Sequence, residues 1–137
     1  MWHTFTLEIA TRGKGLYDIT AEVQAQIAAS GVQEGMCFLF VPHTSASLVL
    51  NENWDPTARA DLEEAFEHLV PEGQAWFRHT LEGADDMPAH IRAALTLPSV
   101  CIPIEHGHLT LGTWQGVYLF EHRSRPHRRK VLVRILA

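Results

Sequence analysis

Histidine and carboxylate side chains are concentrated in one polar stretch, residues 79–90, which reads His-Thr-Leu-Glu-Gly-Ala-Asp-Asp-Met-Pro-Ala-His. These are the side chains that bind metal ions or transfer protons near neutral pH. Asp86 and His90 are four residues apart where a short helix is expected, so their side chains can lie on one face. The stretch therefore predicts a metal or acid–base site. A capped helix that carries surface histidines is the alternative.

A third histidine, His43, follows an apolar run. Residues 36–42 are almost continuously apolar, which is typical of a strand buried on both faces. Small hydroxylated residues such as Ser45 come next, as in a strand that is half core and half pocket wall. We predict that the three histidines converge on one pocket. The predicted metal ligands are His43, His79 and His90, and the predicted catalytic residues are His43, Glu82, Asp85, Asp86 and His90.

These residues fit more than one kind of chemistry. Imidazole and carboxylate ligands suit zinc, iron, nickel or manganese, and catalysis would need an open coordination position. The same groups can perform acid–base chemistry without a metal. A phosphate ligand would instead favour magnesium on Asp85 or Asp86, with a cation such as Arg123 beside it. No nucleophile-elbow pattern surrounds Ser45 or Ser47, which argues against a serine hydrolase.

The segments around these residues predict an α+β fold. Strands are expected over 2–11, 36–42, 99–104, 117–122 and 131–136, helices over 18–30 and 56–69, a short helix from about 87, and a basic turn over 123–130. Asp85 or Asp86 should cap the short helix. The second helix should bury Ala58, Leu62, Ala65, Phe66 and Leu69. Strands and helices do not alternate regularly, which argues for α+β rather than a doubly wound sheet, and residues 1–137 should form a single domain.

The composition is that of an ordinary globular protein, with 46% hydrophobic and 20% charged residues, which argues against disorder. The net charge of −5 argues against a nucleic-acid partner. Ten of the sixteen acidic residues lie in 51–90 and six of the eleven basic residues lie from Arg123 onward, so these segments pair or the tail serves an anionic ligand. No signal peptide or membrane span is evident, and a cytoplasmic protein with no membrane partner is expected.

Several longer motifs resemble one known family. They are His43-Thr-Ser-Ala-Ser-Leu with Asn51-Glu52 and Asp55-Pro56, His79 through Ile91, and Gly112-Thr-Trp-Gln-Gly116 with Glu121. In this order they resemble the YjbQ family of small uncharacterised proteins, from about residue 5 to the C-terminus. The resemblance implies an α+β sandwich of mixed or antiparallel sheet with two main helices and one short helix. It also implies a homotrimer with a site near subunit contacts.

The resemblance also implies a secondary thiamine-phosphate synthase activity, a transferase reaction. It would join hydroxymethylpyrimidine diphosphate to thiazole phosphate and release pyrophosphate, with magnesium or zinc as the divalent metal. In that setting Asn51 and Glu52 would orient the ligand or the histidines, and Trp114 would stack on the pyrimidine. The expected substrate-binding residues are Ser45, Asn51, Glu52, Thr113, Trp114, Gln115 and Arg123.

Two other hypotheses remain open at this point. One is a metal-dependent hydrolase or a binding protein for another small phosphorylated molecule. The other is an oligomeric regulatory or scaffold protein whose polar cluster is structural.

Overall fold

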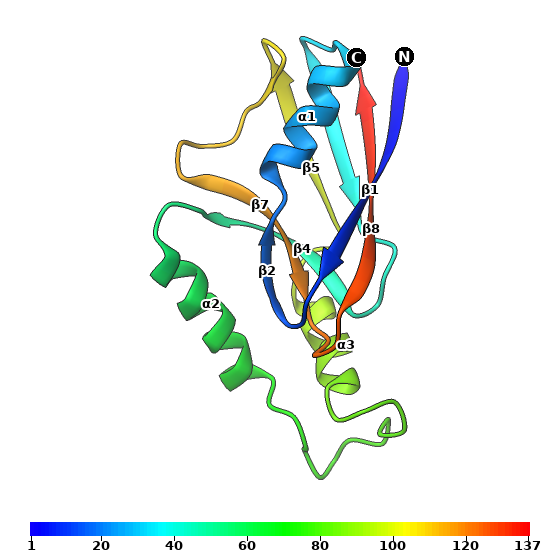
Figure 1. Cartoon of the computed structure of the whole chain (residues 1–137), viewed down its shortest axis with the longest axis vertical. Helices are drawn as coiled ribbons and strands as arrows, with labels where there is room; N and C mark the ends of the chain where they lie inside the picture. The colour runs from blue at the N-terminus through cyan, green and yellow to red at the C-terminus, as the bar shows by residue number, and fades with distance from the viewer.

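The structure, a computed structural model, describes residues 1–137 as two antiparallel sheets with three helices (Figure 1). The first sheet has the order β1-β8-β3-β5-β6 and the second the order β2-β7-β4. The elements are β1 (Trp2–Thr11), β2 (Gly15–Asp18), α1 (Thr20–Ser30), β3 (Gly35–Phe40), β4 (Ala46–Glu52), α2 (Pro56–Leu69), α3 (Asp86–Leu95), β5 (Ser99–Glu105), β6 (His108–Leu109), β7 (Gln115–Glu121) and β8 (His127–Leu136). The predicted α+β fold is confirmed, with two main helices and one short helix.

The main core lies between the two sheets and under α1. Inward residues of β3, β5 and β8 meet those of β4 and β7, and Val23 and Ile27 of α1 close the layer. Strands β5 and β8 alternate buried and exposed positions because only one face of the five-stranded sheet is covered. The N- and C-terminal strands pair along their whole length, from Trp2 with Leu136 to Thr11 with His127.

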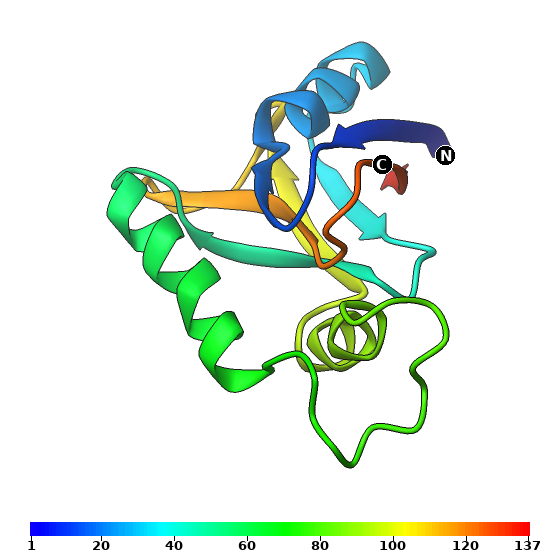
Figure 2. The same cartoon turned by 60° about the horizontal axis from the view of Figure 1, so that its bottom comes forward.

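Helix α2 lies on the outer face of the three-stranded sheet, at one side of the molecule (Figure 2). Asp55 caps it by accepting a hydrogen bond from the Thr57 backbone N–H at 2.9 Å. Leu62 and Phe66 pack on the small second core, but no residue of α2 is fully buried, and Leu69 is 69% exposed. The prediction that five residues of this helix are buried is therefore wrong. The three-stranded sheet covers only part of one face of α2.

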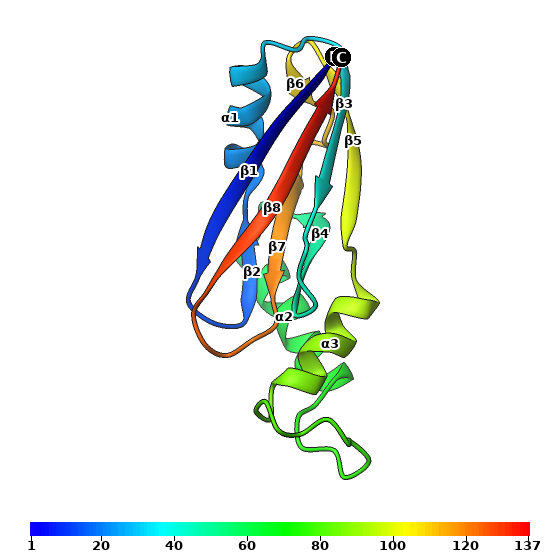
Figure 3. The same ribbon diagram turned by 90° about the vertical axis from the view of Figure 1, so that its right-hand side faces the viewer.

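The outer face of the five-stranded sheet has no helix over it (Figure 3). Phe38 is 37% exposed and Phe40 is 46% exposed, so β3 is not buried on both faces, as the apolar run predicted. Trp2 lies beside Phe38 with ring centroids 5.7 Å apart. The residues of β3 are apolar on both faces of the strand, but only one of these faces lies in the core and the other lies at the surface of this chain.

Three local features differ from the sequence expectations. The short strand β2 was not predicted. The last strand begins at His127 rather than 131, so Arg129 lies in a strand and faces inward rather than in a basic turn. Helix α1 starts at Thr20 rather than at residue 18, and Asp18 accepts hydrogen bonds from the Thr20 N–H and hydroxyl. No helix in the structure combines the length and apolar character needed to cross a membrane.

Candidate functional site

Asp86, the first residue of α3, is the centre of the candidate site. Its Oδ2 atom lies 2.6 Å from His79 Nε2 and 2.9 Å from His90 Nε2, and only 2% of the Asp86 side chain is exposed. His90 follows one helical turn after Asp86, as the spacing predicted, and His79 comes from the loop before α3. One ligand atom from each residue lies within 4.8 Å of the other two.

Arg123, in the loop between β7 and β8, fixes the other side of this carboxylate. Its Nη1 donates to Asp86 Oδ1 at 2.6 Å, its Nε donates to Asp85 Oδ2 at 2.9 Å, and its Nη2 donates to the Glu82 carbonyl. The guanidinium therefore holds protein carboxylates, and the expectation that Arg123 holds a substrate phosphate is not met in this chain. Its observed role is to orient Asp86.

Asp85 has a different role from the one expected. It does not cap α3 with its side chain, because Oδ2 accepts hydrogen bonds from Arg123 and from the Ser124 backbone N–H at 2.8 Å. Burial opposes ionisation of Asp85, but these two hydrogen bonds and the Arg123 charge outweigh it and lower its pKa. Asp85 thus ties the β7–β8 loop to the start of α3.

The carboxyl group of Asp86 is ionised in the folded chain. Burial alone would raise its pKa, but the hydrogen bond to His79 and the charges of His90 and Arg123 lower the pKa below the usual value. A buried carboxylate surrounded by two imidazoles is a donor set that suits a transition-metal ion.

The orientation of His90 is fixed by the backbone. Its Nδ1 lies 2.9 Å from the Thr44 carbonyl oxygen, which can only accept a hydrogen bond, so Nδ1 carries a proton. The Nε2 atom faces the Asp86 carboxylate at 2.9 Å, so either a proton on Nε2 or a metal cation links the two atoms. The contact from imidazole to backbone carbonyl is also typical of metal-ligating histidines.

His43 lies outside this group, so the predicted three-histidine pocket is not formed within one chain. Its Nε2 accepts a hydrogen bond from the Lys130 backbone N–H at 2.9 Å. Burial first, and then the charge of Arg129, lower the pKa of His43. After β3 the chain turns so that the carbonyl of Thr44, rather than the ring of His43, reaches His90. Asp86, which was predicted as a catalytic residue and as a possible magnesium ligand, takes the place expected for His43 beside His79 and His90.

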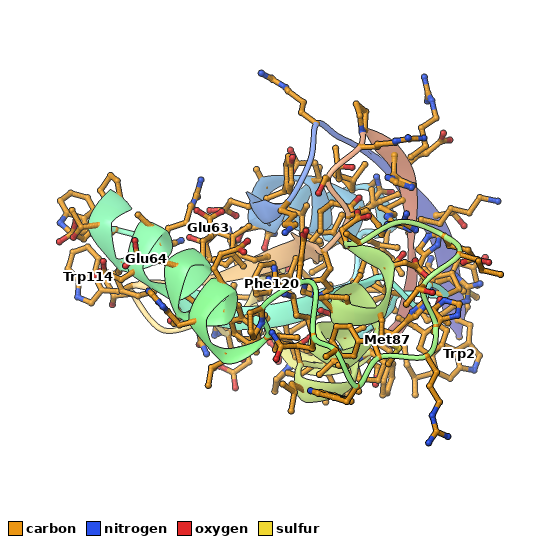
Figure 4. All side chains as sticks on the ribbon, turned by 90° about the horizontal axis from the view of Figure 1, so that it is seen from below. Trp2, Glu63, Glu64, Met87, Trp114 and Phe120 are labelled. Carbon is orange, nitrogen blue, oxygen red and sulfur yellow. The ribbon has the colours of Figure 1, made fainter.

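Most of the expected substrate-binding residues lie at the far end of β4 and β7. Along β4, residues 46 and 52 are about 20 Å apart, and Glu52 pairs with Gln115 at the distant end. Figure 4 shows Trp114 and Met87, the neighbour of Asp86, at opposite sides of the molecule. Trp114 packs on Trp54 with centroids 5.0 Å apart, instead of facing the histidines.

The remaining predicted residues at that end have local structural partners. Asn51 Oδ1 accepts from the Glu52 N–H, the Glu52 carboxylate accepts from backbone N–H groups before α2, and Gln115 Oε1 accepts from the Gly112 N–H. Thr113 lies in the loop before Gln115. Within one chain these residues do not form the opposite wall of the histidine site.

Two cavities flank the Asp86 cluster. One of about 700 Å³ lies beside His90 and is lined by Thr44, Ala93, Ala94, Thr96 and Pro98. The other, of about 270 Å³, lies on the His79 side and is bordered by Phe77 and Met87. The carboxylate of Glu82, which was predicted to be catalytic, lies 3.7 Å from His79 Nε2, and the Glu82 side chain is 66% exposed. The cluster can therefore be reached from both sides.

A buried chain of hydroxyl and imidazole side chains connects the three-stranded sheet to the C-terminal end of α3. His122 Nε2 lies 2.8 Å from Ser47 Oγ, Ser47 contacts Thr96 Oγ1, and Thr96 donates to the Arg92 carbonyl at 2.8 Å. The side chain of His122 is fully buried. Burial first, then the charges of Arg92 and Arg129, lower its pKa to about 3. His122 is therefore neutral in the folded chain.

His122 makes stability fall at acid pH. The unfolded chain binds a proton on this residue near pH 6.5, whereas the folded chain does not until about pH 3. Its contribution to stability is thus present above pH 6.5 and is lost as the pH falls through this window, at about 1.4 kcal/mol per pH unit. We expect the free energy of unfolding of wild type, minus that of His122→Gln, to drop by about 2–3 kcal/mol between pH 6 and pH 4 in urea titrations. An unchanged difference would contradict a neutral, buried His122.

Sequence reasoning missed Arg129, which lies in a second buried network. Its Nε and Nη2 donate to Glu121, and Nη2 also donates to Ser45 Oγ at 2.9 Å. Glu121 is fully buried and accepts a further hydrogen bond from Thr11 at 2.6 Å. Ser45, expected in the pocket wall, is held inside this network. Arg129 shares the strand parity of Val131, and this signal would have placed it inside.

Comparisons with known proteins agree with the family resemblance. The family described as UPF0047 protein YjbQ-like matches residues 4–137. The chain is 54% identical to UPF0047 protein sll1880 of Synechocystis sp. over 133 residues, which cover 97% of this chain and 90% of that protein. It is 43% identical to YjbQ of Salmonella typhimurium, with 96% of each covered. The crystal structure of the conserved hypothetical protein TT1486 from Thermus thermophilus aligns with a TM-score of 0.86 and 39% identity, covering 96% of this chain and 99% of that one. The chain belongs to the YjbQ (UPF0047) family.

Proposed function

We propose that His79, Asp86 and His90 bind a divalent transition-metal ion, and that the metal acts on a small phosphorylated molecule. The observation that carries this proposal is the convergence of three ligand atoms, one each from His79, Asp86 and His90, within 4.8 Å of one another, with His90 Nδ1 tied to the Thr44 carbonyl. A metal ion at this point would accept a lone pair from each of the three residues.

The donor set supports zinc or a similar ion over magnesium. Two imidazole nitrogens and one carboxylate are common ligands of catalytic zinc, whereas magnesium prefers oxygen ligands. Two residues would orient the metal ligands. The Thr44 carbonyl holds His90, and the Arg123 guanidinium holds Asp86. Three protein ligands would leave a position open for water or substrate.

The chain's own residues would divide the work at this site. A bound metal would supply Lewis-acid chemistry or a water of lowered pKa. The cavity beside His90 would hold the substrate, and Asp86 and His90 would position the metal. Glu82 is held by no cation through its side chain and lies 3.7 Å from His79, so it is placed to accept a proton at its carboxylate. This arrangement suits hydrolysis or group transfer at a phosphorylated centre.

The thiamine-phosphate synthase activity implied by the family resemblance is a narrower proposal for the same site. It is tested by combining hydroxymethylpyrimidine diphosphate, thiazole phosphate and either zinc or magnesium with the protein. Pyrophosphate release that requires His79 and His90 would support it. Metal binding without this activity would favour hydrolysis or binding of another phosphorylated molecule.

The metal itself is tested by elemental analysis of untagged protein. We expect near-stoichiometric metal in wild type and its loss in the His79→Ala/His90→Ala double variant. His68→Ala is the matched control, because His68 is exposed on α2 and its nearest charged contact is Glu64 at 3.7 Å. Equal metal in all three proteins would contradict the proposal. No metal, together with no thermal shift by phosphates, would favour the non-catalytic oligomer.

We also propose that the chain is a homotrimer assembled through the outer face of the five-stranded sheet. Trp2, Phe38 and Phe40 expose a large apolar surface there, more than isolated surface residues would. We expect Phe38→Glu/Phe40→Lys to lower the molar mass measured by sedimentation equilibrium to that of one chain. Glu64→Lys, an exposed position on α2 away from this face, should leave the assembly intact. An unchanged mass in the double variant would show that the interface does not lie on this face.

A further inference from the structure

One guanidinium nitrogen of Arg129 is free at the floor of a separate cavity. This cavity, of about 500 Å³, is lined by His43, Thr44 and Arg129, with apolar walls from residues such as Val41 and Pro98. Arg129 itself is 5% exposed. Its Nε and Nη2 are occupied by Glu121 and Ser45, but Nη1 has no hydrogen-bond partner in the chain and is not sealed from solvent. A buried cation thus presents an unused donor to the cavity.

His43 supplies a second donor to the same cavity. Its Nε2 accepts from the Lys130 N–H, so a neutral His43 carries its proton on Nδ1. Nδ1 has no partner in the chain, and His43 borders the cavity. A guanidinium nitrogen and an imidazole N–H at one cavity are donors that suit an oxyanion.

The charges around the cavity are mainly positive. The ions that act on His43 are the cations Arg129 and Lys130 and the single carboxylate of Glu121. Glu121 is already satisfied by Thr11 and Arg129, so it offers no free oxygen to repel an anion at close range. The local field therefore favours anions although the whole chain is acidic.

We propose that Arg129 and His43 form an oxyanion-binding pocket for a phosphate monoester. The pocket adjoins the Asp86 cluster, because Thr44 and Pro98 line both this cavity and the one beside His90. Its link to a reaction rests on the proposed function, in which this phosphate would belong to the substrate. The binding itself does not require a metal. The pocket also supplies the phosphate contact that Arg123 does not provide, because Arg123 is occupied by Asp85 and Asp86.

The test is a titration of metal-free protein, in the presence of a chelator, with inorganic phosphate. Binding is followed by ¹H–¹⁵N NMR at the Arg129 Nε and at the Lys130 amide, which contacts His43. We expect saturable shifts at these two positions and about tenfold weaker binding in Arg129→Lys, which keeps the charge but loses the fork of donors. Arg128→Gln, an exposed neighbour with the same charge, should change the affinity by less than about twofold.

Further variants keep the test decisive. The double variant Glu121→Gln/Arg129→Gln removes both buried charges together. It replaces Arg129→Lys in the phosphate titration if Arg129→Lys does not fold. Loss of phosphate binding in the folded double variant supports the pocket. An equal loss in Arg128→Gln, unchanged binding in Arg129→Lys, or no binding to wild type overturns it. Acetate bound as tightly as phosphate overturns the phosphate assignment. Asp86→Asn should bind phosphate normally, so failure of the metal site and failure of this pocket are distinguishable.

Discussion

Asp86→Asn is expected to weaken zinc binding at least about 100-fold. Loss of a residue that only orients a metal ligand costs roughly 10–100-fold in affinity, so loss of the central charged ligand should cost more. The asparagine keeps the size of the side chain but removes the charge that His79, His90 and Arg123 all contact. The affinity is measured by competition with a chromophoric chelator, with circular dichroism as the check on folding.

Asp61→Asn is the matched control, because Asp61 is an exposed carboxylate on α2. It should bind zinc like wild type. If Asp86→Asn binds zinc within about threefold of wild type while remaining folded, Asp86 is not a ligand, and the cluster would be an ion-paired helix start. The same titrations in Arg123→Gln should show an intermediate loss, since Arg123 holds Asp86 without being a ligand itself.

The largest effect on stability is expected from Arg129→Leu. Breaking a buried ion pair by removing one partner costs about 3–5 kcal/mol, because the other charge is left uncompensated. Glu121 would be that charge: it is fully buried and receives two guanidinium nitrogens from Arg129. Equilibrium unfolding in guanidinium chloride at pH 7 measures the loss. Arg128→Leu, on the exposed face of β8, should change stability by less than about 1 kcal/mol.

The pH dependence of the stability loss in Arg129→Leu shows whether the uncompensated charge of Glu121 causes that loss. In wild type, burial of Glu121 is outweighed by the hydrogen bonds from Arg129 and Thr11, so its pKa is lowered and its contribution is present at neutral pH and lost as the pH falls. In Arg129→Leu, burial prevails and the carboxyl prefers its neutral form, so the deficit should shrink toward pH 4. Glu121→Gln/Arg129→Leu should recover most of the loss at pH 7. A deficit that is unchanged with pH and in the double variant would assign the effect to packing.

Local sequence signals predicted the elements that carry the site. Asp55-Pro56 marked the start of α2, and the four-residue spacing of Asp86 and His90 placed both on one face of α3. These features depend on capping and helical periodicity, which are encoded by neighbouring residues. The α+β class followed from the order of strands and helices.

The arrangement of the site depended on contacts that are distant in sequence. His43 was grouped with His79 and His90 because all three stand in polar segments, but the backbone of Lys130, 87 residues away, holds the His43 ring. Trp114 was expected near the histidines, but the antiparallel register of β4 and β7 places it at the other end of the sheet. Composition and local pattern do not determine such register. Arg129 is different, because its parity with the apolar residues of β8 was present in the sequence.

The measurement that tests the central claim most directly is anomalous diffraction at the zinc edge, from crystals of untagged protein grown with one equivalent of zinc. We predict one strong anomalous peak in contact with His79 Nε2, an Asp86 carboxylate oxygen and His90 Nε2, with the His90 Nδ1 contact to Thr44 retained. A map with no peak at this cluster, or with the peak on other residues, would contradict a metal site centred on Asp86.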